Sequence, residues 1–148
     1  MKQTIPYWHE LPDLDLYLDQ VLLYVNQVVN SQESLEQKKL TAAMVNNYVK
    51  HKQIEKPIKK KYQKQQVARL IALTILKNVF SIQEISQTLH LLLQTNSSET
   101  LYNHFVDCMR NEENEKTPDI IRYACQSVKL YYKTRQLTVE LERKFHES

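Results

Sequence analysis

Apolar residues recur at three- and four-residue steps through most of the chain, a spacing typical of helices with one buried face. Polar stretches without this period separate them, chiefly at 30–39 and 94–98. The pattern predicts helices over 14–29, 42–51, 64–78, 82–93, 99–111 and 118–145. A mainly α fold follows, with about five to six helices joined by short polar loops.

Residues that cap helices stand at the start of most of these stretches. Thr41 precedes the second helix, and Ser81 makes a capping box with Glu84 at the fourth. The remaining candidates are Asp13 or Asp15, Ser97 or Ser98, and Thr117 with Pro118. Leu14 is expected on the buried face of the first helix and Val79 on that of the third.

The first residues form an extended arm rather than a helix, because Pro6 and Pro12 interrupt any helical run. Tyr7 and Trp8 lie between these prolines. We expect the two aromatic side chains to pack back on the body, although an exposed binding surface is the alternative.

The last predicted helix is about 28 residues long and would span about 40 Å at 1.5 Å per residue. Its apolar residues run along one side: Tyr123, Leu130, Leu137, Leu141 and Phe145. An apolar seam on so long a helix suggests a contact between two copies of the chain, hence a homodimer. The alternative is a helix that folds across the domain, with a bend near Arg135.

Composition excludes several classes of function. The chain has no glycine, which disfavours phosphate-binding loops, dinucleotide-binding motifs and tight hairpins. Cys108 and Cys125 sit in apolar helical patterns, and with the scattered histidines they do not form a metal site. No catalytic motif, cofactor motif, secretory signal or membrane-spanning run is present, so we expect a cytoplasmic protein that is not an enzyme.

Charge is concentrated in one segment. Residues 38–69 contain ten Lys or Arg and one acidic residue, Glu55, within a chain whose formal net charge is only +3. Such a local excess is typical of a surface that binds phosphate groups.

The basic segment contains a short helix followed by an extended lysine-rich loop at about 55–62. Asn46 and Asn47, on the outward face of the helix, can read base edges in a major groove, and Ala42 and Ala43 permit close approach. Lysines of the loop can neutralise phosphates. The predicted DNA-binding residues are Thr41, Ala42, Ala43, Asn46, Asn47, Lys50, His51, Lys52, Lys56, Lys59, Lys60, Lys61 and Tyr62.

The register LTAAMVNNYVKHKQI, followed by P-x-x-K-x-Y, resembles the MerR-type helix-turn-helix and wing, and FSIQEI is similar to the start of that family's fourth helix. LYLDQV, LTAAMVNNYVK, KKKY and LKNVFSIQEI together resemble a bacterial domain-of-unknown-function family with a MerR-like core. The resemblance covers roughly residues 5–93. Two arginines of the MerR pattern are replaced here by Ala43 and Asn46, and its first tyrosine by Asn47.

The resemblance implies a MerR-like winged helix-turn-helix domain with its N-terminal arm over 1–95, and a C-terminal helical extension over 96–148 for dimerisation or an effector. It also implies a sequence-specific transcriptional regulator that binds double-stranded DNA. The alternative is a protein-interaction adaptor or anti-regulator on a degenerate helix-turn-helix core. RNA binding is disfavoured, because the aromatic residues lie away from the basic segment.

Overall fold

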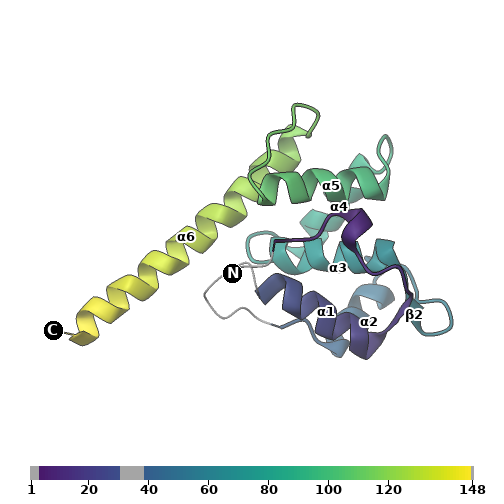
Figure 1. The fold of residues 1–148 in the computed structure, drawn as a ribbon, viewed down its shortest axis with the longest axis horizontal. Helices are drawn as coiled ribbons and strands as arrows, with labels where there is room; N and C mark the ends of the chain where they lie inside the picture. The colour runs from purple at the N-terminus through teal and green to yellow at the C-terminus, as the bar shows by residue number, and fades with distance from the viewer. Residues whose placement is uncertain (1–3, 31–38, 148) are drawn as a thin grey trace.

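The computed structural model describes residues 4–30 and 39–147, which form six α-helices, a short 3₁₀-helix and a two-stranded sheet (Figure 1). The elements are η1 (Trp8–Glu10), β1 (Leu16–Tyr17), α1 (Leu18–Asn30), α2 (Ala42–Lys50), β2 (Lys61–Tyr62), α3 (Lys64–Leu76), α4 (Ile82–Leu92), α5 (Ser98–Met109) and α6 (Asp119–Glu147). The mainly α class is therefore confirmed. Most of the polar stretch predicted as a loop at 30–39 lies outside the described residues.

Helix α3 is the centre of the molecule, lying between α1 and α5 (Figure 1). It is buried on most of its surface, and Leu70, Ile71 and Ile75 are at 0% exposure. Thr74 is buried as well, and its hydroxyl donates to the Leu70 carbonyl at 2.6 Å. The same apolar core extends to Phe105 of α5 and beyond, on both sides of position 95.

The first helix begins later than the apolar pattern predicted. Leu16 and Tyr17 form β1, which pairs antiparallel with β2, so that Leu16 faces Tyr62. The backbone N–H of Tyr17 donates to Gln20 Oε1 at 2.9 Å, and α1 starts at Leu18. Leu14, expected on the buried face, is 79% exposed because the helix does not reach it.

Capping chemistry placed two helix starts correctly. Thr41 Oγ1 accepts from the Met44 N–H at 3.2 Å, and the capping box between Ser81 and Glu84 is present. At α5 the cap is Ser97 rather than Ser98. At α6 the predicted cap, Thr117, instead places its hydroxyl 3.1 Å from His104 Nδ1, and the helix begins two residues later.

Helix α3 ends before the predicted boundary, at Leu76. Val79 follows this helix in a turn, and its side chain is 40% exposed. The prediction that Val79 lies on the buried face of the helix is therefore wrong.

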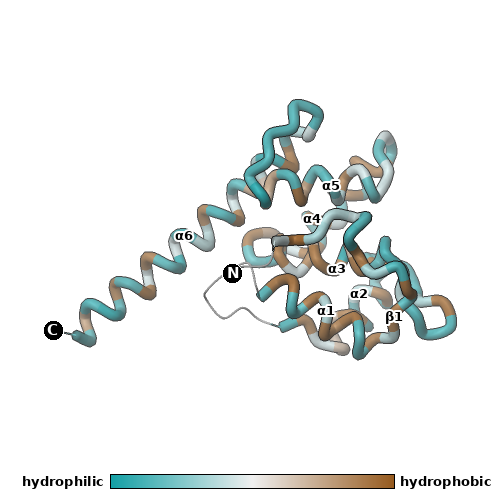
Figure 2. Tube along the Cα trace, viewed as in Figure 1, coloured by the Kyte–Doolittle hydropathy of each residue, from teal (hydrophilic) through white to brown (hydrophobic). Residues whose placement is uncertain are grey.

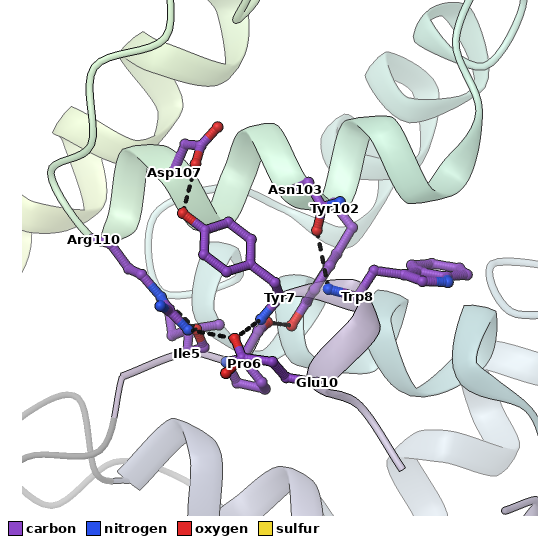
Figure 3. A network of polar contacts seen from close by, with 9 residues as sticks. All are labelled: Ile5, Pro6, Tyr7, Trp8, Glu10, Tyr102, Asn103, Asp107 and Arg110. Carbon is purple, nitrogen blue, oxygen red and sulfur yellow. Dashed lines mark hydrogen bonds and ion pairs between the residues drawn. The ribbon is translucent and has the colours of Figure 1, made fainter. Parts of the chain in front are cut away.

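The N-terminal arm packs on α5, as expected for its aromatic residues (Figure 3). The Tyr7 hydroxyl donates to Asp107 Oδ1 at 2.6 Å, and the Trp8 N–H donates to Asn103 Oδ1 at 3.0 Å. The Arg110 guanidinium donates to the Ile5 carbonyl at 2.9 and 2.6 Å. These bonds join segments about one hundred residues apart in the sequence.

The same network continues through three further contacts. The Tyr102 hydroxyl donates to the Pro6 carbonyl at 2.7 Å. Arg110 forms an ion pair with Glu10 at 2.9 Å and stacks on the Tyr7 ring at 4.3 Å from its centroid. The arm and α5 are thus one packed unit.

Helix α6 starts against α5 and then leaves the body as a straight rod (Figure 1). Its buried residues are Cys125, Val128 and Tyr132, all in the first half. Residues Asp119–Glu147 form one uninterrupted helix that points away from the body, so the alternative of a helix folded across the domain, with a bend near Arg135, is wrong. Apolar positions continue along the projecting half (Figure 2). Within the described residues, no helix combines the length and the apolar composition needed to cross a bilayer.

The Tyr7–Asp107 hydrogen bond predicts a pH dependence of stability. This bond to the Asp107 carboxylate, together with burial, raises the pKa of Tyr7 to about 12. Since the folded value lies above the unfolded value of about 10, the stabilisation is complete below pH 10 and is lost as the pH rises toward 12. We expect Tyr7→Phe to lower the free energy of unfolding by about 1 kcal/mol at pH 8 and to flatten its decline at alkaline pH.

Urea unfolding of both proteins at neutral and alkaline pH measures this difference. Tyr17→Phe is the control, because the Tyr17 side chain is 49% exposed and the substitution keeps the ring that Lys61 contacts. Identical pH dependence in wild type and Tyr7→Phe would contradict the assignment.

Candidate nucleic-acid interface

Helix α2 turns one face to the core and the other to solvent. Val45 and Tyr48 are at 0% and 5% exposure, while Asn46 and Asn47 between them are exposed. Each asparagine amide offers donors and an acceptor, so the outward face can bind a group that presents both. Ala43, also exposed, leaves room for close approach to this face.

The end of α2 holds a lysine in the left-handed conformation. The N–H groups of Lys52 and Gln53 donate to carbonyl groups in the last turn at 3.1 and 2.8 Å, the pattern of a Schellman motif. Lys52 has a φ of 61° at the position that glycine usually occupies in this motif. His51 Nδ1 lies 2.9 Å from the Asn47 carbonyl oxygen and closes the same turn.

Two further lysines form the tip of a tight hairpin. Ile58 N donates to Lys61 O at 3.0 Å and Lys61 N donates to Ile58 O at 2.9 Å, across Lys59 and Lys60. These central residues have φ values of 51° and 66°. Positive φ at both positions is the signature of a type I′ turn, which normally contains Asn-Gly. The absence of glycine therefore does not prevent a tight hairpin here, contrary to expectation.

Backbone strain is concentrated in this basic segment. Among the described residues, the non-glycine residues with positive φ are Lys52, Lys59, Lys60 and Asn111. Asparagine tolerates this conformation, whereas other L-residues lose roughly 1–2 kcal/mol there. Such strain persists only where the surrounding structure enforces it, and it is often found at functional sites.

One buried amide holds the lysine loop against α3. Gln66 is 6% exposed, and its Nε2 donates to the carbonyl groups of Glu55 and Lys56 at 2.9 and 3.0 Å. Its Oε1 accepts from the Gln63 N–H at 2.6 Å. The first two bonds hold the loop at Glu55 and Lys56 against α3, and the third orients the Gln66 amide.

The arm supports the other side of the hairpin. Asp13 forms an ion pair with Lys64 at 2.7 Å, and Lys61 Nζ lies 5.3 Å from the centroid of the Tyr17 ring. Tyr62 is 3% exposed, and burial raises the pKa of its phenol. Tyr62 therefore anchors β2 in the core and is not at the surface, where a DNA contact would require it.

Most of the other predicted contact residues are accessible. Ala42 and Lys61 are half-buried, and the exposed ones are Thr41, Ala43, Asn46, Asn47, Lys50, His51, Lys52, Lys56, Lys59 and Lys60. We call Lys50, Lys52, Lys56, Lys59 and Lys60 the basic surface. In residues 4–30 and 39–147, none of these five lysines forms an ion pair with a carboxylate. Their charges are thus available to an external anion.

Helix α2 and the hairpin lie in the same part of the view, at the opposite end of the body from α6 (Figure 1). In the described part of the chain, no three His, Cys, Asp or Glu side chains gather in a way that could hold a metal ion. The arrangement of α2 and the hairpin is one of exposed amides and cations, which suits the binding of a polar or anionic partner.

Three supporting residues were missed from the sequence: Gln66, Tyr17 and Asp13. Gln66 had a local signal, since it stands three residues after Gln63 at a helix start and accepts from its N–H as in a capping box. Tyr17 and Asp13 had none, because their partners lie more than forty residues away.

The strained hairpin predicts a stabilising substitution. Lys59→Asn/Lys60→Gly places the preferred pair in the type I′ turn, and we expect the free energy of unfolding to rise by about 1–2 kcal/mol. Thermal and urea unfolding measure the change. Lys59→Ala/Lys60→Ala is the matched control, because it removes the same two charges but keeps both Cβ atoms. A gain as large in this control would show that charge repulsion, not backbone strain, is relieved.

A family model described as a domain of unknown function, DUF1836, matches residues 6–105, and so includes α2, the hairpin, α3, α4 and most of α5. No curated protein and no solved structure matches the chain. Because the model covers well over half of the sequence, the chain belongs to the DUF1836 family.

Proposed function

We propose that this protein is a sequence-specific DNA-binding regulator of transcription, cytoplasmic and without catalytic activity of its own. In this proposal α2 enters the major groove, and the lysines of the hairpin contact phosphates. The observation that carries the proposal is the basic surface itself. Its lysines form no ion pair within residues 4–30 and 39–147, three of them have the left-handed conformation, and they lie at the end of and after a helix with two exposed asparagines.

The order of elements supports a winged helix-turn-helix. Two helices, α1 and α2, are followed by a short hairpin in the place of a wing and then by α3 and α4. This order agrees with the MerR-like core that the sequence resembles. A helix and a basic hairpin at the same end of the body suit a duplex, since the groove accepts the helix while the hairpin lies on the backbone.

Salt dependence tests the phosphate contacts. Five contacts from the basic surface imply a slope of about −4.5 for log K against log salt concentration. Lys59→Asn/Lys60→Gly removes two of them, so we expect weaker binding to all duplexes and a slope near −2.7. Fluorescence anisotropy with labelled duplexes measures both quantities.

The control is Lys133→Gln/Lys144→Gln, which removes the same charge from exposed positions on α6. This double variant should bind as wild type does. Equal losses in the two variants, or no duplex binding at low salt, would contradict the proposal.

Base recognition needs a separate measurement. Selection from a random duplex library should give an enriched motif with wild type, whereas Asn46→Ala and Asn47→Ala should broaden that motif. An unchanged motif in both variants would remove α2 from the recognition of bases.

A protein-interaction adaptor is the second candidate. The observation that favours it is the composition of α2, whose outward face has Ala43 and Asn46 where the MerR pattern has arginines. An acidic protein partner would bind the same lysines, and competition between that partner and DNA would distinguish the two functions.

We also propose that two copies associate along the exposed side of α6. Tyr123, Leu130 and Leu137 repeat every seven residues and are 64%, 67% and 46% exposed. Leu141, four residues further, is 56% exposed. A heptad seam without a covering element is the pattern of a coiled coil that lacks its second strand.

Leu137→Glu tests this association, because it places one glutamate from each copy in the seam. We expect the dissociation constant of the dimer to rise by at least about tenfold, equivalent to roughly 1.4 kcal/mol. Sedimentation velocity over a range of concentrations measures it, with the neighbouring Gln136→Glu as the control. A monomeric wild type at all concentrations would rule out the proposed contact.

A further inference from the structure

A cavity of about 450 Å³ lies between α3, α4, α5 and the first turns of α6. Most of its lining is apolar, including Ala72, Leu76, Ile85, Leu89, Leu101 and Phe105. This volume is within the range of pockets that bind small organic molecules. Glu84, Ile120 and Tyr123 also line it and are exposed, so they mark its opening to solvent.

The packing of α4 shows that the cavity is part of the fold. This helix has a capping box and an apolar face, yet none of its residues is fully buried. Ile85, Leu89 and Leu92 remain half-buried because they face the cavity. An apolar occupant would bury this surface and be bound by the hydrophobic effect.

Arg69 of α3 is the one positively charged residue among the described residues that line the cavity. Burial lowers the pKa of the Arg69 guanidinium, while Glu55 acts in the opposite direction. Among the described residues, no carboxylate lies within ion-pair distance of Arg69. A largely buried cation without a paired carboxylate is unfavourable, and an anionic group inside the cavity would relieve this.

A few polar side chains also line the cavity, and their positions along α3 and α4 define how a ligand would be oriented. Arg69 and Leu89 line both this cavity and a neighbouring one of about 110 Å³, so the Arg69 side chain lies between the two cavities, close to Leu89 of α4. Glu84 stands five residues before Leu89, about 7.5 Å along the helix axis. Gln65, one turn before Arg69 on α3, and Thr88 on α4 offer hydrogen-bond donors on the lining. A ligand can therefore place an anionic head at Arg69 and keep its apolar body toward the Glu84 end.

We propose that this cavity binds a small monocarboxylate with an aliphatic body, its carboxylate on Arg69 and its chain along α4. The geometry of the cavity carries this proposal whether or not the protein binds DNA. Binding is measured on the protein alone, so the two proposals can fail separately.

The chain provides its own reporter. Trp8 is its one tryptophan and lines the cavity, with its ring 6.2 Å from that of Tyr102 in an edge contact. A ligand that enters the cavity displaces solvent from the indole ring. Tryptophan fluorescence of the full chain thus reads occupancy directly.

Titration with decanoate and with decan-1-ol, which has the same chain length without the charge, tests the proposal. We expect saturable binding of decanoate at least about tenfold tighter than of the alcohol, with a matching rise in Tm. Arg69→Met should abolish that preference, whereas Arg143→Met, on the exposed end of α6, should preserve it. Ala124→Phe fills the cavity from α6 and should prevent binding of both compounds.

Three results would overturn the proposal. The first is equal affinity of the wild type for decanoate and the alcohol, and the second is no saturable response to either. The third is a Trp8 signal that changes with protein concentration alone, which would assign the cavity to a second copy of the chain. The wild-type comparison decides the matter even if Arg69→Met does not fold.

Discussion

The candidate interface depends on the three hydrogen bonds of the Gln66 amide. A buried amide is stable only when its donors and acceptor are satisfied, and here the loop before the hairpin supplies two of the partners. The arrangement fixes Glu55 and Lys56 on α3, the most buried helix of the molecule. The hairpin therefore begins from a defined point, and its lysines project from a rigid base rather than from a free loop.

The left-handed lysines follow from this constraint. With the loop fixed at Gln66 and β2 paired with β1, the chain reverses across Lys59 and Lys60 in a type I′ turn, which has positive φ at both positions. Glycine or asparagine would accept that geometry with less strain. Lysine at Lys59 and Lys60 instead places two cations at the most projecting point of the hairpin, and the core interactions of Tyr62 and Ile54 maintain it.

The sequence predicted the helical class, most helix boundaries to within a few residues, and the exposure of Asn46 and Asn47. Those features depend on local chemistry: Thr41 and Ser81 cap their own helices, and the apolar period sets the faces. The sequence did not predict β1, the hairpin geometry, or the arm contacts with α5. In each case the deciding partner is distant, as Tyr62 is for Leu16, and a local pattern contains no information about it. Leu14 and Val79 were misplaced for the related reason that tertiary pairing and turn geometry, not apolar period, decide where α1 and α3 end.

The arm explains why α5 belongs physically with the preceding helices. Ile5, Pro6 and Tyr7 are bonded to Arg110, Tyr102 and Asp107, so removing α5 would leave the arm without its partners. Further along the chain, Asp13 pairs with Lys64 at the start of α3, and the Tyr17 ring lies under Lys61 of β2. One N-terminal segment thus reaches both the cavity, through Trp8, and β2 at the base of the hairpin, through Tyr17. The family match over residues 6–105 covers nearly all of this closed unit, and α6 adds its projecting seam from outside it.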